Sequence, residues 1–305
     1  MYIDYVSVKL QREGNDMSGK KLQCPICSGG GVVAVHKGTR DDGTVDVYEC
    51  SACGTKFLDI PKMEHDYEHG FMYENDPLSD LDIEERLRWF HEDDFRRYQM
   101  VRTLCTGKKV LDFGCGFGGF LHYISEVAGV CSGVELGENE REYLNKKGIR
   151  CFRTIDDTEG KFDIITLFHV FEHLSNPEKW LEKFSDYLEP GGYLVIEVPN
   201  ANDILLSLYE NEKFADFTYW SAHLFLYTMK SLTMLINRVG KYDIVSPGQV
   251  QRYSIANHLM WLAKGVPGGH KDWNYLDSEE LNKAYAEKLS QLQMCDTLFF
   301  VLSRR

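Results

Sequence analysis

The sequence of 305 residues contains no run of about 18 apolar residues, so we expect no membrane-spanning helix. The N-terminal stretch MYIDYVSVKLQREG lacks the apolar core of a secretory signal. Lysine and arginine are too few and too scattered to hold a phosphate backbone: 34 of them face 47 acidic residues, for a formal net charge of −13. We therefore expect a soluble, cytoplasmic protein with no nucleic-acid partner and no membrane insertion.

The nine cysteines are odd in number and accompany no secretion signal, which argues against a disulfide framework. Two CxxC pairs, CPIC and CSAC, can each place two thiolates on one ion and together complete the closed site of a structural zinc. A redox pair is the alternative, although CPIC lacks the βαβ context of such motifs. Four cysteines leave no vacancy for His36 or His65. The predicted zinc ligands are Cys24, Cys27, Cys50 and Cys53.

Short apolar runs alternate with helical patterns from Lys109 onward, which indicates a mostly parallel α/β sheet. A helix should begin at Asn176-Pro177 and stop before Pro190-Gly191-Gly192, and another should run from Thr228 to near Gly240. An earlier helix should bury Leu87, Phe90, Phe95, Tyr98 and Val101. Strands are expected at 110–113, 130–136, 150–154, 162–168, 193–199 and 297–303.

The segment VLDFGCGFGGFL runs from a strand into three glycines, Gly114, Gly116 and Gly118, and then into a helix. Glycine lets the backbone approach a ligand closely. Glu135 follows about 20 residues later, where an acid can accept hydrogen bonds from ribose hydroxyls. Asp112 would repel a pyrophosphate but suits a cofactor that carries a sulfonium and an ammonium group. The literal GxGxxG pattern keeps a nicotinamide dinucleotide as the alternative.

From about Leu104 to Arg305 the chain resembles a class I S-adenosylmethionine-dependent methyltransferase. The resemblance rests on VLDFGCGFGGF, GVEL, FDIITLFHVFEHL and LEPGGYLVIEVPN. With CPIC…CSAC and HLFLYT, the chain is similar to a bacterial branch that pairs a zinc-binding N-terminus with such a domain. That branch includes nucleotide-sugar C-methyltransferases and relatives from polysaccharide pathways.

The resemblance implies an α/β, Rossmann-like sheet of seven strands in the order 3-2-1-4-5-7-6, in which 297–303 is the antiparallel seventh strand. A zinc-ribbon-like module would occupy residues 1–60, a helical linker or cap 61–104, and the methyltransferase domain 105–305. The resemblance also implies cofactor contacts. Asp112 and the loop glycines, Gly118 included, would face the methionine end of the cofactor. Glu135 would contact the ribose and Asp156 the adenine. Phe168 and His169 would approach the cofactor, and His169 is the residue best placed to face the transferred methyl.

The segments expected to bind the methyl acceptor follow a less regular sequence pattern. Residues 200–227 are too long for a simple connection and rich in aromatic side chains, so we expect a substrate lid. His223 aligns with a histidine of the sugar C-methyltransferases, but Trp220 and Ala222 stand where those enzymes have Tyr and Glu. O-methylation with His223 or His169 as the base is therefore expected at least as strongly as C-methylation.

The sequence thus predicts methyl transfer from S-adenosylmethionine to a small polar acceptor, such as a nucleotide-linked sugar or another polysaccharide precursor. Arg252 either stays solvated or meets an anionic group of that acceptor. The alternative function is modification of a protein, with the zinc module as the docking element.

Overall fold

The computed structural model describes residues 22–58 and 82–305. Both ends of the expected zinc module, 1–21 and 59–60, and residues 61–81 of the expected linker, His65 among them, lie outside the described residues. Within the described ranges, no helix is long and apolar enough to cross a membrane.

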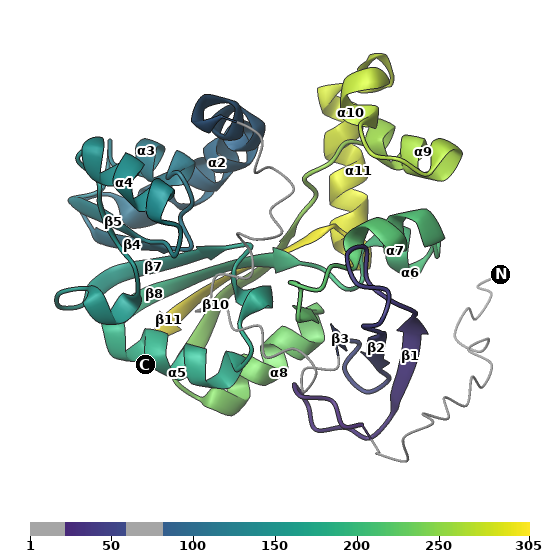
Figure 1. The fold of residues 1–305 in the computed structure, drawn as a ribbon, viewed down its shortest axis with the longest axis horizontal. Coiled ribbons are helices and arrows are strands. Elements are labelled where there is room, and N and C mark those ends of the chain that lie inside the picture. Colours follow the sequence, from purple (N-terminus) through teal and green to yellow (C-terminus); the bar gives the residue numbers. More distant parts are fainter. Residues whose placement is uncertain (1–21, 59–81) are drawn as a thin grey trace.

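A sheet of seven strands forms the centre of the chain (Figure 1). Its order is β6-β5-β4-β7-β8-β11-β10, and β11 runs antiparallel to both of its neighbours. Counted from β4, this is the expected order 3-2-1-4-5-7-6. The sequence pattern did not locate β10, an edge strand that contains Pro247 and lacks a clear apolar alternation. The strands are β4 Lys109–Phe113, β5 Val130–Val134, β6 Arg150–Phe152, β7 Phe162–Phe168, β8 Leu188–Pro199, β10 Tyr242–Val250 and β11 Thr297–Arg304.

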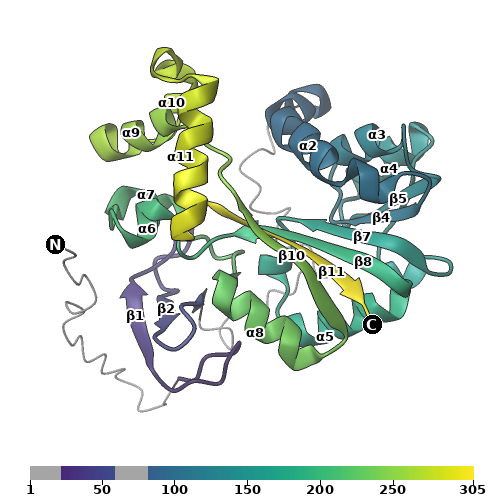
Figure 2. The same ribbon diagram turned by 180° about the vertical axis from the view of Figure 1, so that it is seen from behind.

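Helices cover both faces of this sheet. In Figures 1 and 2, α2 (Ile83–Cys105), α3 (Gly119–Ile124) and α4 (Glu138–Lys146) lie on one side, and α5 (Pro177–Tyr187) and α8 (Met229–Val239) on the other. As predicted, Thr228 caps α8 and a left-handed Gly240 ends it. The remaining helical elements are short or C-terminal: η3 Ile155–Asp157, η4 Phe171–His173, α6 Ile204–Ser207, α7 Glu212–Thr218, α9 Ile255–Lys264, α10 Gly269–Asp272, η5 Asn274–Leu276 and α11 Glu279–Leu292.

The buried face of α2 differs from the prediction. Phe90 and Phe95 were expected to be buried, but they are 39% and 42% exposed. The helix buries Asp94 and Arg97 instead, together with Val101 and Cys105. The physical reason is that α2 packs over charged partners at the ends of the strands, so its inward face has to be polar.

The cysteine-bearing segment forms a second, antiparallel sheet in the order β1-β2-β3-β9. Its last strand comes from far along the chain and completes the sheet beside α8. Lys56 Nζ donates to the Ala201 carbonyl at 2.6 Å, and Thr228 Oγ1 donates to the Cys53 carbonyl at 2.7 Å. Because its buried side chains belong to the same hydrophobic core as those of the large sheet, this unit is fixed to the sheet. The strands are β1 Val32–His36, β2 Val47–Cys50, β3 Lys56–Leu58 and β9 Phe225–Leu226.

Candidate active site

A cavity of about 420 Å³ opens between α2 and the carboxyl ends of β4 and β7. Its volume is typical of small-molecule sites, which in parallel α/β sheets lie at this end of the strands. The glycine loop forms one wall, and Phe90 and Arg97 of α2 form another. His169, Trp220 and Arg252 complete the lining on the remaining side.

The backbone of the glycine loop adopts a conformation that favours glycine. Gly114, Gly116 and Gly118 have φ angles of 77°, 51° and 75°, in the left-handed region that other residues rarely adopt. A Cβ on Gly116 would meet no atom within 4 Å, so this position opens onto free space. A Cβ on Gly119 would lie 2.0 Å from Asp94 Oδ2. The loop therefore leaves room both for a ligand and for α2.

Two buried carboxyl groups support this loop. Asp112 lines the cavity and accepts a hydrogen bond from Thr166 Oγ1 at 2.6 Å. Glu135 accepts from the backbone N–H groups of Gly116 and Gly137, at 2.7 and 3.0 Å. Burial raises the pKa of each carboxyl group to about 7. A cationic group bound in the cavity would favour the ionised form of Asp112, as expected for a sulfonium or ammonium ligand.

Asp156, the expected adenine contact, lies away from the cavity lining. Its carboxylate accepts hydrogen bonds from Lys183 Nζ and Tyr187 Oη, both at 2.7 Å, and the Lys183 bond lowers its pKa. The structure thus brings Asp112, Gly114, Gly116, Phe168 and His169 together at one cavity. It places Asp156 outside this group and Glu135 behind the loop.

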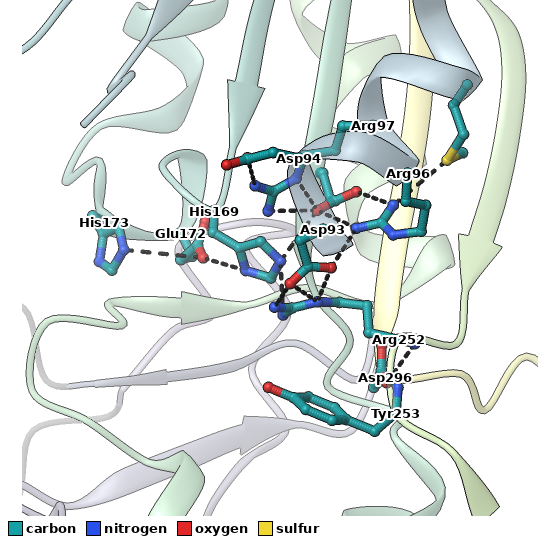
Figure 3. A network of polar contacts seen from close by, with 12 residues as sticks. Asp93, Asp94, Arg96, Arg97, His169, Glu172, His173, Arg252, Tyr253 and Asp296 are labelled. Carbon is teal, nitrogen blue, oxygen red and sulfur yellow. Dashed lines mark hydrogen bonds and ion pairs between the residues drawn. The ribbon is translucent and has the colours of Figure 1, made fainter. Parts of the chain in front are cut away.

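A network of ion pairs joins α2 to β8 (Figure 3). Glu197 of β8 is fully buried and binds Arg96 Nη1 at 2.8 Å and Arg97 Nε at 2.9 Å. Burial by itself raises the pKa of Glu197, but the charges of Arg97 and Arg96 hold this pKa well below its usual value. The network therefore ties the inward face of α2 to the central sheet beside the cavity.

Arg252 extends this network and is not a solvated side chain. It forms a two-point ion pair with Asp93 of α2, and its Nη1 lies 3.2 Å from His169 Nε2. Burial alone would lower the pKa of Arg252, but the Asp93 charge raises it above its usual value. Asp93 therefore compensates the charge of an arginine that lines the cavity.

This network of ion pairs was not predicted from the sequence. The signals were present in DDFRR, where acids and arginines three positions apart share a face of α2, and in the single glutamate of the apolar strand YLVIEVP.

His169 lies where β7 ends and has a φ of 56°, which is uncommon for a residue with a side chain. Strained backbone of this kind clusters at functional sites. Its Nδ1 is 3.3 Å from Glu172 Oε1, and its Nε2 is 3.4 Å from Glu197 Oε1. The imidazole thus borders the cavity with a carboxylate near each nitrogen and with Arg252 Nη1 beside Nε2.

His223 is absent from the cavity lining, whereas its neighbour Trp220 belongs to it. Its ring centroid lies 5.3 Å from that of Trp220 and 5.1 Å from that of His173. Burial, followed by the proximity of His173, lowers the pKa of His223 to about 3. This geometry favours His169 over His223 as the group that meets an acceptor.

The two CxxC pairs converge as their spacing predicts. Cys24 Sγ lies 3.7 Å from Cys53 Sγ, and Cys27 Sγ lies 3.5 Å from Cys50 Sγ. All four sulfur atoms lie within 4.8 Å of one another. Tetrahedral zinc with bonds of about 2.3 Å requires sulfur separations of about 3.8 Å, so these residues fit a zinc ion.

The chain belongs to a known protein family. A family model described as "Methyltransferase domain" matches residues 83–244. Two similar curated proteins are named ubiquinone biosynthesis O-methyltransferase. The one from Shewanella pealeana is 25% identical over 107 residues, which are 32% of this chain and 45% of that protein. The one from Azoarcus sp. is 29% identical over 125 residues, 37% of this chain and 54% of that protein. The chain spans about half the length of these relatives.

Among solved structures, a SAM-dependent methyltransferase from Archaeoglobus fulgidus is similar. Its sequence is 21% identical, the TM-score is 0.49, and the match covers 72% of this chain and 97% of that one.

Proposed function

Because this chain belongs to the methyltransferase-domain family, whose model matches more than half of it, we propose that it transfers a methyl group from S-adenosylmethionine to a hydroxyl group of a small acceptor. The observation that carries the proposal is one cavity lined by the glycine loop, Asp112 and His169. Relatives named as O-methyltransferases favour oxygen as the methylated atom.

Different residues would contact different parts of the cofactor, whose sulfonium supplies an electrophilic methyl group. Asp112, ionised once a cation is bound, would face the methionine ammonium group. Gly114 and Gly116 leave room for the ligand beside their backbone. Glu135 would accept hydrogen bonds from the ribose, and Phe168 would pack against the reacting end. The roles of Asp112, Gly114, Gly116 and Phe168 follow from the cavity lining. The role of Glu135, which lies outside that lining, rests on its spacing from the glycine loop.

His169 is the proposed base. In the transfer an acceptor oxygen forms a bond to the methyl carbon while the carbon–sulfur bond breaks, and the acceptor proton passes to the imidazole. Glu172 and Glu197 lie on either side of the imidazole, near Nδ1 and Nε2, and hold it in position at the cavity. Orientation in the cavity supplies much of the remaining acceleration, since a sulfonium is already a good leaving group.

Replacing His169 with Asn should lower the rate of methyl transfer by about 10²- to 10⁴-fold, the usual contribution of a positioned base. Binding of S-adenosylhomocysteine should be retained. The assay follows a labelled methyl group from S-adenosylmethionine into hydroxylated aromatic compounds and, in a separate arm, into nucleotide-linked sugars. His122→Asn, a change at an exposed histidine of α3, is the matched control and should keep full activity.

Equal rates for the His169→Asn and wild-type proteins would remove His169 as the base. Label found in intact proteins, with none in any small molecule, would instead support the protein-modifying alternative. That alternative treats the cysteine unit as a docking element, whereas the unit packs firmly against the large sheet.

We further propose that Cys24, Cys27, Cys50 and Cys53 hold a structural zinc ion. Native mass spectrometry of Cys50→Ser should show one zinc fewer per chain than the wild type, because the substitution removes one of four thiolates. Cys131→Ser, at a half-buried single cysteine, is the control and should keep the full zinc content. Equal zinc content in the two variants would contradict the assignment.

A further inference from the structure

Glu172 is a fully buried acid that forms no hydrogen bond among the described residues. Its side chain has no exposed surface, and both carboxylate oxygens lack a hydrogen-bond partner among the described residues. The nearest basic atoms are His169 Nδ1 at 3.3 Å and His173 Nε2 at 4.0 Å from Oε1 (Figure 3). A buried carboxylate without hydrogen bonds is costly, so a bound cation would stabilise it.

Two histidines lie beside this carboxylate, and each has a ring nitrogen within reach of it. His173 Nδ1 lies 2.6 Å from the Ala222 carbonyl, which can only accept, so Nδ1 carries the proton and Nε2 keeps its lone pair. A backbone carbonyl on the far nitrogen is the usual support of a metal-binding histidine. His223 Nδ1 is buried and has no hydrogen-bond partner among the described residues.

We propose that Glu172, His173 and His223 bind a divalent transition-metal ion such as Zn²⁺, at a site separate from the four cysteines. One donor atom from each residue lies within 4.8 Å of the others. Two imidazoles and one carboxylate are a donor set that zinc accepts, with bonds of about 2.0–2.2 Å. Donors around such an ion lie about 3.3–3.5 Å apart, so His173 Nε2 and Glu172 Oε1, now 4.0 Å apart, would approach by about 0.5 Å when the ion binds.

The site lies directly behind the cavity wall. Glu172 and His173 belong to η4, which follows His169, and His223 belongs to the segment that contains Trp220. The ring of Trp220 contacts both histidines, with centroid distances of 6.1 and 5.3 Å. An ion here joins η4 to this segment and holds the two cavity-lining residues, His169 and Trp220, in position. The ion would therefore position the cavity wall and would not contact the acceptor.

Metal content tests the proposal independently of activity. The full chain, stripped of metal and reloaded with Zn²⁺, should carry two ions per chain in native mass spectrometry. Glu172→Gln keeps the shape of the side chain and should carry one. His223→Asn should also carry one, and it decides the question if Glu172→Gln fails to fold. His122→Asn, outside both clusters, should keep two.

Reloading with Co²⁺ distinguishes the two sites by their spectra. The cysteine site should give intense sulfur-to-cobalt charge-transfer bands, and the Glu172 site only the weaker bands of nitrogen and oxygen ligands. In Cys50→Ser the first set should disappear and the second should persist. One ion per chain in the wild type, lost entirely in Cys50→Ser, would overturn the proposal and leave His169 or a bound water as the partner of Glu172.

Discussion

Gly116→Val should weaken binding of S-adenosylhomocysteine by at least about 100-fold, a loss of about 3 kcal/mol in binding free energy. At Gly116 the backbone has a φ of 51°, and an added Cβ would point into open space. A β-branched side chain there would occupy the volume assigned to the cofactor. Isothermal titration with S-adenosylhomocysteine measures the change.

Gly148→Val separates this effect from backbone strain. Gly148 has a φ of 81°, a Cβ there would also meet no atom within 4 Å, and the residue lies outside the cavity lining. This variant should lose stability while keeping wild-type affinity. Equal affinity in Gly116→Val and Gly148→Val would show that the cofactor does not bind beside Gly116. A wild-type protein that fails to bind would refute the cofactor assignment itself.

Glu197→Gln should lower the free energy of unfolding by about 3–5 kcal/mol, the usual cost of breaking a buried ion pair. Glu197 is fully buried, and its loss leaves the charges of Arg96 and Arg97 without their shared partner. Urea unfolding at pH 7 measures this loss. Glu178→Gln is the control, because Glu178 pairs with Arg238 at the surface and such pairs contribute at most about 1 kcal/mol.

The effect of Glu197→Gln should depend on pH in one direction. The pKa of Glu197 in the folded protein is depressed, so its contribution is fully present above the unfolded value of about 4.5 and is lost as the pH falls through the folded value. The difference between wild type and variant should therefore shrink in strong acid. Equal urea midpoints for Glu197→Gln and Glu178→Gln at pH 7 would contradict the stabilising role of the network.

Local patterns were sufficient to predict much of this fold. The strand at 162–168, the cap at Thr228 and the glycine at position 240 each depend on residues a few positions apart. The same holds for the glycine loop, whose turns only glycine tolerates. The cysteine pairs were recognisable because each CxxC places two ligands locally. Such features are determined by residues that lie close together in the sequence.

Features that depend on packing between distant segments could not be predicted in this way. Arg252 meets Asp93 across 159 positions, and no periodicity encodes that meeting. The exposure of Phe90 depends on which face of α2 meets Glu197. His223 resembles a catalytic residue in sequence, yet its place behind Trp220 is set by tertiary packing.

The small sheet cannot be completed until late in the synthesis of the chain. Its third strand, β3, pairs on one side with β9, whose residues lie about 170 positions later. A nascent chain therefore emerges with one edge of β3 open, and that edge stays open while β4 to β8 are translated. The cysteine unit begins first and is completed late, so early translation products are the ones most exposed to wrong strand pairing.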